Sequence, residues 1–396
     1  MYCSAFMSAV SSKNDVILPP ATIGILGGGQ LGRMSIMAGR KLGYRFVVYE
    51  PKGPNSPAGV LADEEINAPY DDMDALRTFA QKCDVVTYEF ENVPSGPLQM
   101  ISSYAPVRPG AKALHTCQNR RREKQFLQDN NFPCAPFAIV NNADELQSAW
   151  RQLGGEVVLK SADFGYDGKG QRKLEAGDDT AKVWREMNVE AAVLEKWIRF
   201  KGEYSVICAR NANGDEMAFP LTANEHRNHI LHLSQAPARG VDATRQMEAE
   251  ELAMGIARAL DVEGLIAVEL FLTDEGWLVN EMAPRPHNSG HYSFDACLTS
   301  QFEQHIRAIC NLPLGDPRLL SPVAMVNLLG DVWKAAGEAG PDWPTLLRHP
   351  RAKLHLYGKD APKAGRKMGH FCVMADSAGE AAKEAETLLQ QISRQA

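Results

Sequence analysis

The chain has no apolar run long enough to cross a membrane, no closely spaced cysteine pair and no excess of basic residues. The first absence argues against a membrane protein, since a spanning helix needs about 20 apolar residues. The net charge of −7 disfavours nucleic acid as the main partner, because a phosphate backbone attracts a basic surface. The 396 residues, 44% of them hydrophobic, suffice for two or three domains with cores of their own.

The cysteines are few and scattered. None of the eight lies in the CxxC spacing typical of zinc sites, which favours buried free thiols in a reducing cytoplasm over a disulfide framework. Residues 1–20 lack the basic start of a signal peptide, so we expect a flexible extension that ends at Pro19-Pro20.

From residue 21 onward, short apolar strands alternate with helical segments, a pattern that predicts a parallel α/β sheet. Later segments instead predict antiparallel pairs, at 264–272 with 276–280 and at 353–357 with 370–374. The other expected elements are strands at 22–26, 45–49, 84–88 and 192–194, and helices at 33–42, 119–130, 247–260 and from 377.

An apolar strand at 157–159 ends on Lys160 and leads into a glycine-rich loop at 165–171. Lysine suits a phosphate oxygen, and glycines let backbone N–H groups approach phosphate closely. The lysine precedes the glycines, unlike in a Walker motif, so the order predicts a nucleotide clamped under a β-hairpin. On this feature alone a plain turn remains the alternative.

The first strand is followed by Gly27-x-Gly29-x-x-Gly32, with Glu50 about 20 residues later, as in the dinucleotide-binding fingerprint. The N-terminus of the following helix would meet an anion. Nothing downstream resembles a dehydrogenase site, so the favoured interpretation is the first turn of a Rossmann-like domain that binds another ligand.

Two glutamates indicate a metal site. Glu269 and Glu281 lie on the neighbouring strands of the first antiparallel pair, where they could hold Mg²⁺ against nucleotide phosphates. The alternative is a pair of strand-edge carboxylates facing water. Glu269 stands in an otherwise apolar run, where an uncompensated charge is costly, and this favours the metal.

Three further segments are polar enough to line a site. Arg285, His287 and Asn288 could orient a small oxyanion, unless they belong to a proline-stiffened loop of no function. Residues 195–198 could bind adenine through the backbone, with Glu203 on the ribose, although alone they indicate only a charged strand end. The bases around Lys359 and Arg366 suit a phosphate, with a solvated loop as the alternative.

Taken together, segments 27–32, 88–92, 165–171, 280–291 and 357–370 resemble the ATP-grasp superfamily and, more closely, its 5-(carboxyamino)imidazole ribonucleotide synthetase family. The resemblance covers residues 21–375. It implies a fold of the α/β and α+β classes, a homodimer, and the cofactors ATP and Mg²⁺. The implied domains are a Rossmann-like domain at 21–117, an ATP-grasp domain at 118–320 with a mobile lid at about 136–197, and a small C-terminal domain at 321–396.

The reaction that the resemblance implies belongs to purine biosynthesis. ATP phosphorylates bicarbonate to carboxyphosphate, and the exocyclic amine of 5-aminoimidazole ribonucleotide takes up the carboxyl group. Another ATP-grasp ligase acting on a small carboxylate, a Rossmann oxidoreductase and a nucleotide-sensing module without turnover are the alternatives.

The resemblance also implies a role for single residues. Those matching ATP-binding positions are Arg120, Lys160, Gly165, Tyr166, Asp167, Gly168, Lys169, Gly170, Gln171, Glu195, Lys196, Trp197, Ile198, Glu203, His226, Asn280 and Glu281. Glu269 and Glu281 match the metal ligands, and Arg285, His287 and Asn288 the catalytic residues around bicarbonate. Those matching ribonucleotide-binding positions are Gly29, Gln30, Leu31, Glu89, Asp167, Lys359 and Arg366. Ala283 stands where relatives such as biotin carboxylase carry a ligating asparagine, so we expect two protein carboxylates on the metal.

Overall fold

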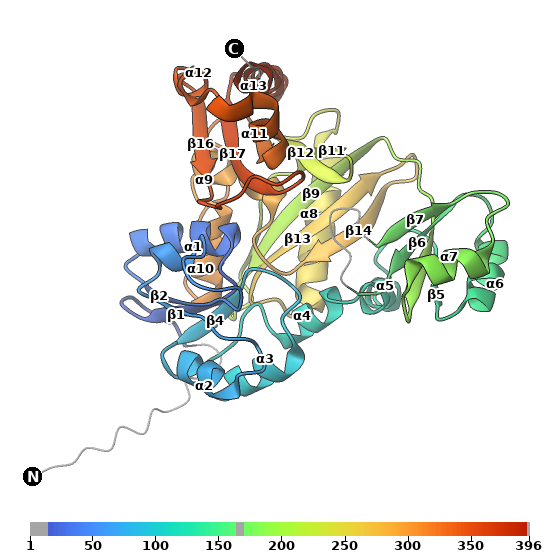
Figure 1. Cartoon of the computed structure of the whole chain (residues 1–396), viewed down its shortest axis with the longest axis horizontal. Coiled ribbons are helices and arrows are strands. Elements are labelled where there is room, and N and C mark those ends of the chain that lie inside the picture. The colour runs from blue at the N-terminus through green and yellow to red at the C-terminus, as the bar shows by residue number, and fades with distance from the viewer. Residues whose placement is uncertain (1–14, 164–169, 394–396) are drawn as a thin grey trace, which may run out of the picture.

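The computed structural model describes residues 15–163 and 170–393. Within these ranges the strands form three sheets: a front sheet, a small separate sheet and a long sheet that continues into the C-terminal elements (Figure 1). None of the described helices is long and apolar enough to span a bilayer.

The front unit is a parallel α/β sheet, as the alternation of strands and helices predicted. Its strand order is β3-β2-β1-β4. Its first helix begins at Gln30 rather than Arg33, because Gly29 is extended and forms the N-cap. The elements are β1 (Thr22–Leu26), α1 (Gln30–Lys41), β2 (Arg45–Tyr49), the 3-10 helix η1 (Gly59–Leu61), β3 (Glu64–Ile66), α2 (Met73–Gln81), β4 (Val85–Tyr88), α3 (Ser95–Ile101) and α4 (Ala111–Cys117).

The beginning of the described chain is attached to the folded body. The backbone N–H of Ile17 donates to the carbonyl oxygen of Cys310 at 2.9 Å, and the Tyr44 hydroxyl donates to the carbonyl oxygen of Ile17 at 2.6 Å. The flexible extension expected to reach Pro20 therefore does not include residues 15–20.

A second, smaller sheet is built from antiparallel strands in the order β5-β8-β6-β7, and we call it the lid sheet. It places Lys160 on β6 opposite Gln171 and Val193. Helix α5 precedes it, and Asn119 caps that helix by accepting from the N–H groups of Arg121 and Arg122. The elements are α5 (Arg120–Asp129), β5 (Phe137–Val140), α6 (Ala143–Leu153), β6 (Val157–Ser161), β7 (Gln171–Leu174), α7 (Thr180–Met187) and β8 (Ala192–Lys196).

The long sheet has nine strands, eight of them in the order β14-β13-β9-β11-β12-β15-β17-β16, with β10 pairing β9. Both predicted antiparallel pairs are confirmed, as β13 with β14 and β16 with β17. The elements of its first part are β9 (Gly202–Arg210), β10 (Glu216–Ala218), β11 (Thr222–Arg227), β12 (Ile230–Ala236), α8 (Ala243–Ala259), β13 (Gly264–Leu272), β14 (Trp277–Ala283), η2 (Asn288–Gly290), α9 (Ser293–Ala296) and α10 (Gln301–Ile309).

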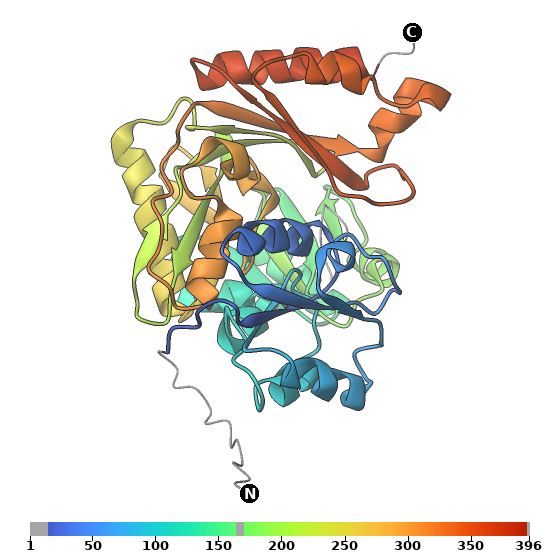
Figure 2. The same ribbon diagram turned by 90° about the vertical axis from the view of Figure 1, so that its left-hand side faces the viewer.

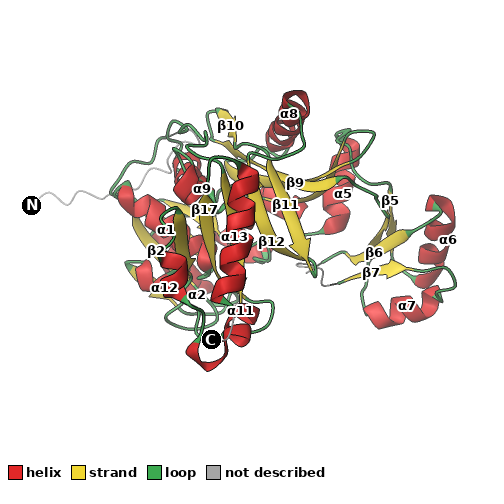
Figure 3. Ribbon diagram, turned by 90° about the horizontal axis from the view of Figure 1, so that it is seen from above, coloured by secondary structure: helices red, strands yellow, loops and turns green. Residues whose placement is uncertain are grey.

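The C-terminal elements continue the same sheet, because β15 pairs with β12. Seen from above, α13 lies between β12 and β17, in the middle of the molecule, with the front unit on one side and the lid sheet on the other (Figure 3). Turned to the side, the C-terminal strands lie above the front unit (Figure 2). The elements are β15 (Val323–Leu329), α11 (Gly330–Ala336), η3 (Gly337–Ala339), α12 (Trp343–Leu347), β16 (Ala352–Leu356), β17 (Lys367–Met374) and α13 (Ala378–Ile392).

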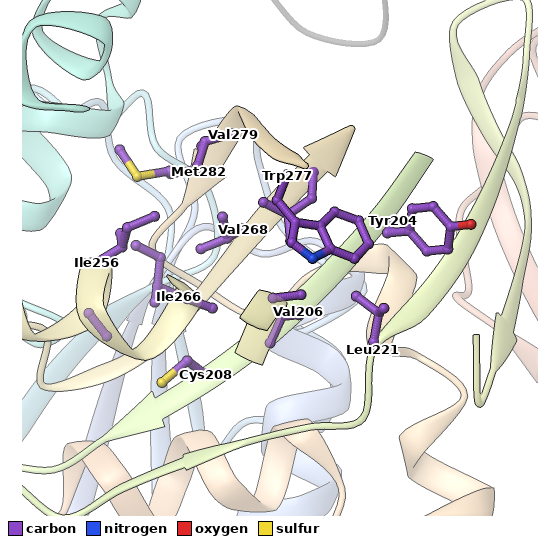
Figure 4. Close-up of a cluster of buried hydrophobic side chains, with 14 of the residues drawn as sticks. Tyr204, Val206, Cys208, Leu221, Ile256, Ile266, Val268, Trp277, Val279 and Met282 are labelled. Carbon is purple, nitrogen blue, oxygen red and sulfur yellow. The ribbon is translucent and has the colours of Figure 1, made fainter. Parts of the chain in front are cut away.

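The core beneath the site lies between α8 and strands β9, β13 and β14 (Figure 4). Ile256 of α8, Val206 of β9 and Ile266 of β13 are fully buried there. The core holds β13 and β14 in place, and these two strands carry the predicted metal carboxylates.

Replacing Ile256 by alanine is expected to lower the free energy of unfolding by about 2–5 kcal/mol, since a cavity remains in a packed core. Met247 on the same helix is 62% exposed, and its replacement by alanine should change stability by less than about 0.5 kcal/mol. Urea unfolding of both variants measures the difference. Equal losses would show that α8 does not pack as described.

Candidate active site

One large cavity collects almost all of the residues that the sequence singled out. Its volume is about 1490 Å³, and its walls are formed by loops of the front unit, by the lid sheet and by the long sheet with the loops of its C-terminal elements. Of the predicted residues that the structure describes, only Gly170 does not line it, while Gly165, Tyr166, Asp167, Gly168 and Lys169 lie outside the described residues. The predicted residues that line it are Gly29, Gln30, Leu31, Glu89, Arg120, Lys160, Gln171, Glu195, Lys196, Trp197, Ile198, Glu203, His226, Glu269, Asn280, Glu281, Arg285, His287, Asn288, Lys359 and Arg366.

Lys160 and Glu195 form an ion pair at the junction of the lid sheet and the long sheet. The Lys160 Nζ lies 3.0 Å from Glu195 Oε2, and the Nζ of the buried Lys124 lies 3.5 Å from the same oxygen. Burial alone would raise the pKa of Glu195, but the two lysines lower it to about 2. The Glu195 carboxylate is therefore ionised and engaged with lysines, which leaves its backbone for any contact with a base.

The linker after β8 has one backbone donor to spare. The N–H of Lys196 donates to the carbonyl of Pro136 at 2.8 Å, and that of Trp197 to Glu156 at 2.9 Å. The N–H of Ile198 has no acceptor among the described residues. Nearby, the rings of Phe200 and Phe271 stack with centroids 4.5 Å apart. An apolar wall beside an open backbone donor suits a flat heterocycle such as adenine.

Glu203 and His226 lie on neighbouring strands, β9 and β11. The His226 Nδ1 is 2.8 Å from Glu203 Oε2. Burial alone would lower the pKa of His226, but the Glu203 carboxylate outweighs it and raises the pKa. The two side chains therefore lie in close contact at the wall of the cavity.

Glu269 and Glu281 face each other in register across β13 and β14. The register shifts just beyond them, so that Leu270 pairs with Val279 and Asn280 is the extra residue of a β-bulge. Burial and the neighbouring Glu281 raise the pKa of Glu269 to about 7. Glu123 of α5 approaches the same pair, and burial and Glu281 raise its pKa to about 8.

A divalent cation fits this arrangement. Two carboxylates in register repel each other, and the raised pKa of Glu269 records that repulsion. The nearest basic contacts are weak: Arg120 lies 3.8 Å from Glu281, and the His287 Nε2 lies 3.3 Å from Glu269. Carboxylate oxygens are the ligands that Mg²⁺ prefers. Ala283 opposes Ala267 and offers no further ligand.

The loop after β14 carries Arg285 and His287. Arg285 makes an ion pair of 2.5 Å with Glu91, while its buried Nε has no partner among the described residues. Burial and the Arg285 charge hold the pKa of His287 well below its usual value, so the ring is neutral. Its Nδ1 accepts from the N–H of Ser289 at 3.3 Å, which assigns the ring proton to Nε2, facing Glu269.

The side-chain amide of Asn288 is fixed by Asn327. Its amide nitrogen donates to Asn327 Oδ1 at 3.0 Å, and its oxygen accepts from Asn327 Nδ2 at 2.6 Å. These reciprocal bonds leave one amide hydrogen of Asn288 for a ligand.

The glycine turn after β1 is occupied by the protein's own carboxylates. Glu89 accepts from the N–H groups of Gly29 and Gly32, and Glu50 accepts from that of Gly28 at 2.7 Å. A dinucleotide pyrophosphate would need those donors, and the acidic residue at the end of β2 would need to face a ribose. The anion expected at this helix N-terminus is thus in part Glu89 itself.

The C-terminal bases meet the front unit across the cavity. The Lys359 Nζ donates to the carbonyl oxygen of Lys367 at 2.7 Å, and Arg366 donates to that of Ala361 at 2.9 Å. Burial and the neighbouring Arg366 lower the pKa of Lys359 to about 8. A phosphate group placed here would favour the protonated lysine.

Models of known families match three consecutive parts of the chain. A ribonucleotide synthetase preATP-grasp domain matches residues 20–118, an ATP-grasp domain 125–302, and a phosphoribosylaminoimidazole carboxylase C-terminal domain 323–384. The N5-carboxyaminoimidazole ribonucleotide synthase of Bacillus subtilis is 45% identical over 363 residues, which cover 91% of this chain and 93% of the relative. The chain belongs to the N5-carboxyaminoimidazole ribonucleotide synthetase family.

Solved structures of N5-carboxyaminoimidazole ribonucleotide synthetases agree. An ADP complex of one is 44% identical, with a TM-score of 0.88, over 94% of this chain and 97% of that one. The Aspergillus clavatus enzyme, in complex with ADP and 5-aminoimidazole ribonucleotide, is 32% identical with a TM-score of 0.84, over 94% of this chain and 98% of that one. The chain is accordingly an ATP-grasp ligase, as its motifs predicted.

Sequence reasoning missed three charged residues of this synthetase site. Glu91 lies in segment 88–92, but no function was predicted for it. It pairs with Arg285 only because the front unit meets the loop after β14. Glu123 and Lys124 lie on α5, which was expected simply as a charged helix, yet both are buried. The only signal for the second pair was their place on the side of the helix that carries Leu127.

The raised pKa of Glu269 predicts how this synthetase responds to pH. The carboxylate must lose its proton to bind a metal, so Mg²⁺-dependent binding of ATP should strengthen as pH rises through about 7. Loss of one proton can raise the binding constant for ATP by at most about tenfold per pH unit. Calorimetry with ATP and Mg²⁺ at several pH values measures it, and Glu269→Gln provides the baseline from the nucleotide's own titration. The same slope in the variant would contradict the assignment.

Proposed function

We propose that this enzyme carboxylates the exocyclic amine of 5-aminoimidazole ribonucleotide, with ATP and bicarbonate as co-substrates, through carboxyphosphate. The products are 5-(carboxyamino)imidazole ribonucleotide, ADP and phosphate. The observation that carries the proposal is the single cavity. It brings together Lys160, the carboxylates of Glu269 and Glu281, the loop with Arg285, and the C-terminal bases. The Aspergillus relative with ADP and 5-aminoimidazole ribonucleotide supports both substrates.

ATP lies, in this proposal, between the lid sheet and the long sheet. The Ile198 N–H and the Phe200–Phe271 wall bind adenine, and Glu203 with His226 holds the ribose. Arg120, Lys160 and loop 165–171 hold the phosphates. Glu269 and Glu281 would hold Mg²⁺, which would offset negative charge on the transferred phosphoryl group.

Bicarbonate lies beside Arg285. The guanidinium is fixed by Glu91 and has its Nε available, which suits a small oxyanion. His287 is neutral and donates from Nε2, and Asn288 retains one amide hydrogen. No nucleophilic side chain is required, because the phosphoryl group passes directly to bicarbonate and the protein supplies position and charge.

The ribonucleotide lies between the front turn and the C-terminal bases. Glu89 occupies the Gly29 and Gly32 donors, so the N–H groups of Gln30 and Leu31 remain for the 5′-phosphate. Lys359 and Arg366 approach from the other side, with Asp167 assigned to this ligand from the family resemblance alone. An acyl phosphate hydrolyses in water, so closure of the lid over the cavity is part of the proposal.

We also propose a cytoplasmic homodimer without nucleic-acid or membrane partners. The family resemblance supports the dimer, and the seven unbonded cysteines of the described chain agree with a reducing compartment.

One assay tests the reaction. ADP release should require ATP, Mg²⁺, bicarbonate and 5-aminoimidazole ribonucleotide together, with each omitted in turn. Turnover with formate or an amino acid in place of bicarbonate would instead identify another ATP-grasp ligase.

Two lysine variants test where each substrate binds. Lys359→Met should weaken ribonucleotide binding by roughly 1.5–3 kcal/mol, the worth of a charged hydrogen bond, or about tenfold to a hundredfold. Lys160→Met should do the same to ATP. Calorimetry with each ligand and each variant gives four values. If Lys359→Met weakens ATP instead, the C-terminal bases belong to the nucleotide site.

A further inference from the structure

Helix α5 carries two adjacent charged residues that are buried. Lys124 is fully buried and Glu123 is 2% exposed. Burying a charge is costly unless partners offset it, so such a pair needs a reason. Neither residue has a role in the proposed function.

Lys124 joins three elements. Its Nζ donates to the carbonyl oxygen of Asn280 on β14 at 2.9 Å and lies 3.5 Å from Glu195 Oε2 on β8. That carboxylate oxygen also meets the Nζ of Lys160 at 3.0 Å. One ammonium group of α5 therefore connects the long sheet with the lid strand that faces Lys160.

Glu123 completes the attachment on the other side of Glu281. Its Oε1 accepts from the N–H of Met282 at 2.5 Å. The two side chains thus hold the residues immediately before and after Glu281, at the β-bulge that brings Glu281 opposite Glu269. Bulges re-aim side chains, and this one has its backbone fixed on both sides.

The charges give Lys124 a second effect. Lys124 and Lys160 share the Glu195 carboxylate, so the three groups together carry one positive charge where the phosphates are proposed to bind. Without Lys124, the charges of Lys160 and Glu195 would offset each other, and less positive charge would remain beside Arg120 for a phosphate.

We propose that Glu123 and Lys124 are positioning residues that set Glu281 and Lys160 in a fixed relation, and that Lys124 keeps Lys160 available to phosphate by sharing Glu195. The inference rests on the proposed nucleotide site, although not on the identity of the carboxylated substrate.

The test uses nucleotide binding to the whole protein, without turnover. Lys124→Met should weaken ADP by about tenfold and leave adenosine within about twofold, since adenosine lacks the phosphates. Lys112→Met is the matched control, because Lys112 also donates to a backbone carbonyl, that of Ala259 at 2.7 Å, away from the cavity. It should bind both ligands like the wild type.

A double variant separates positioning from simple stability. In Lys124→Met with Glu195→Gln, the carboxylate that captures Lys160 is gone, so ADP affinity should recover most of the loss. If Lys124 only supported the fold, the two losses would add and adenosine would weaken as well. Additive losses of ADP affinity in the double variant, weaker binding of adenosine, or unchanged ADP affinity in Lys124→Met would each overturn the proposal.

Glu195→Gln alone keeps the proposal testable if Lys124→Met does not fold. This variant leaves both lysines without their shared carboxylate, so ADP should bind at least as tightly as in the wild type relative to adenosine. Selective weakening of ADP would contradict the charge argument. Because only ADP and adenosine are used, failure of the carboxylation assay would leave this result unaffected.

Discussion

Two carboxylates opposed across β13 and β14 are the constraint around which the site is arranged. Glu269 and Glu281 are in register, and their repulsion, added to burial, raises the pKa of Glu269 to about 7. Such a pair is stable only when packing fixes the strands and cations surround them. The core under these strands provides the first. The Arg120 guanidinium, 3.8 Å from Glu281, provides part of the second, and a divalent cation is proposed for the rest.

The continuity of the long sheet fixes distances that would otherwise vary. Because β15 pairs with β12, the C-terminal strands carrying Lys367 and the loop with Lys359 belong to the same sheet as the carboxylate pair. The Arg285 loop is fixed to the same body, since Gln301 bonds both the N–H and the carbonyl of His287, at 2.9 and 2.7 Å. The lid sheet shares no strand with the long one, so its attachment rests on contacts such as that of Lys124.

The elements and most site residues could be predicted because their signals are local. The strands at 22–26 and 264–272 have the bounds that the apolar pattern gave, and the motif residues converge on one cavity. The partners of those residues could not be predicted. Glu89 reaches the glycine turn through the pairing of β1 with β4, and Lys124 is buried where α5 meets β8 and β14, so neither contact follows from local sequence.

The same partners explain how an acidic chain can receive anionic substrates. Its carboxylates around the cavity are engaged: Glu89 and Glu50 by backbone N–H groups, Glu195 by two lysines, and Glu91 by Arg285. Charges held in this way contribute little net repulsion to an incoming anion, since each is offset within a few ångströms. Glu269 and Glu281 are engaged less fully, since their nearest basic contacts are His287 at 3.3 Å and Arg120 at 3.8 Å, and they are the two carboxylates for which a metal ion is proposed. The net charge of the chain therefore says little about its ligands, because the local pairing of each carboxylate decides what the cavity attracts.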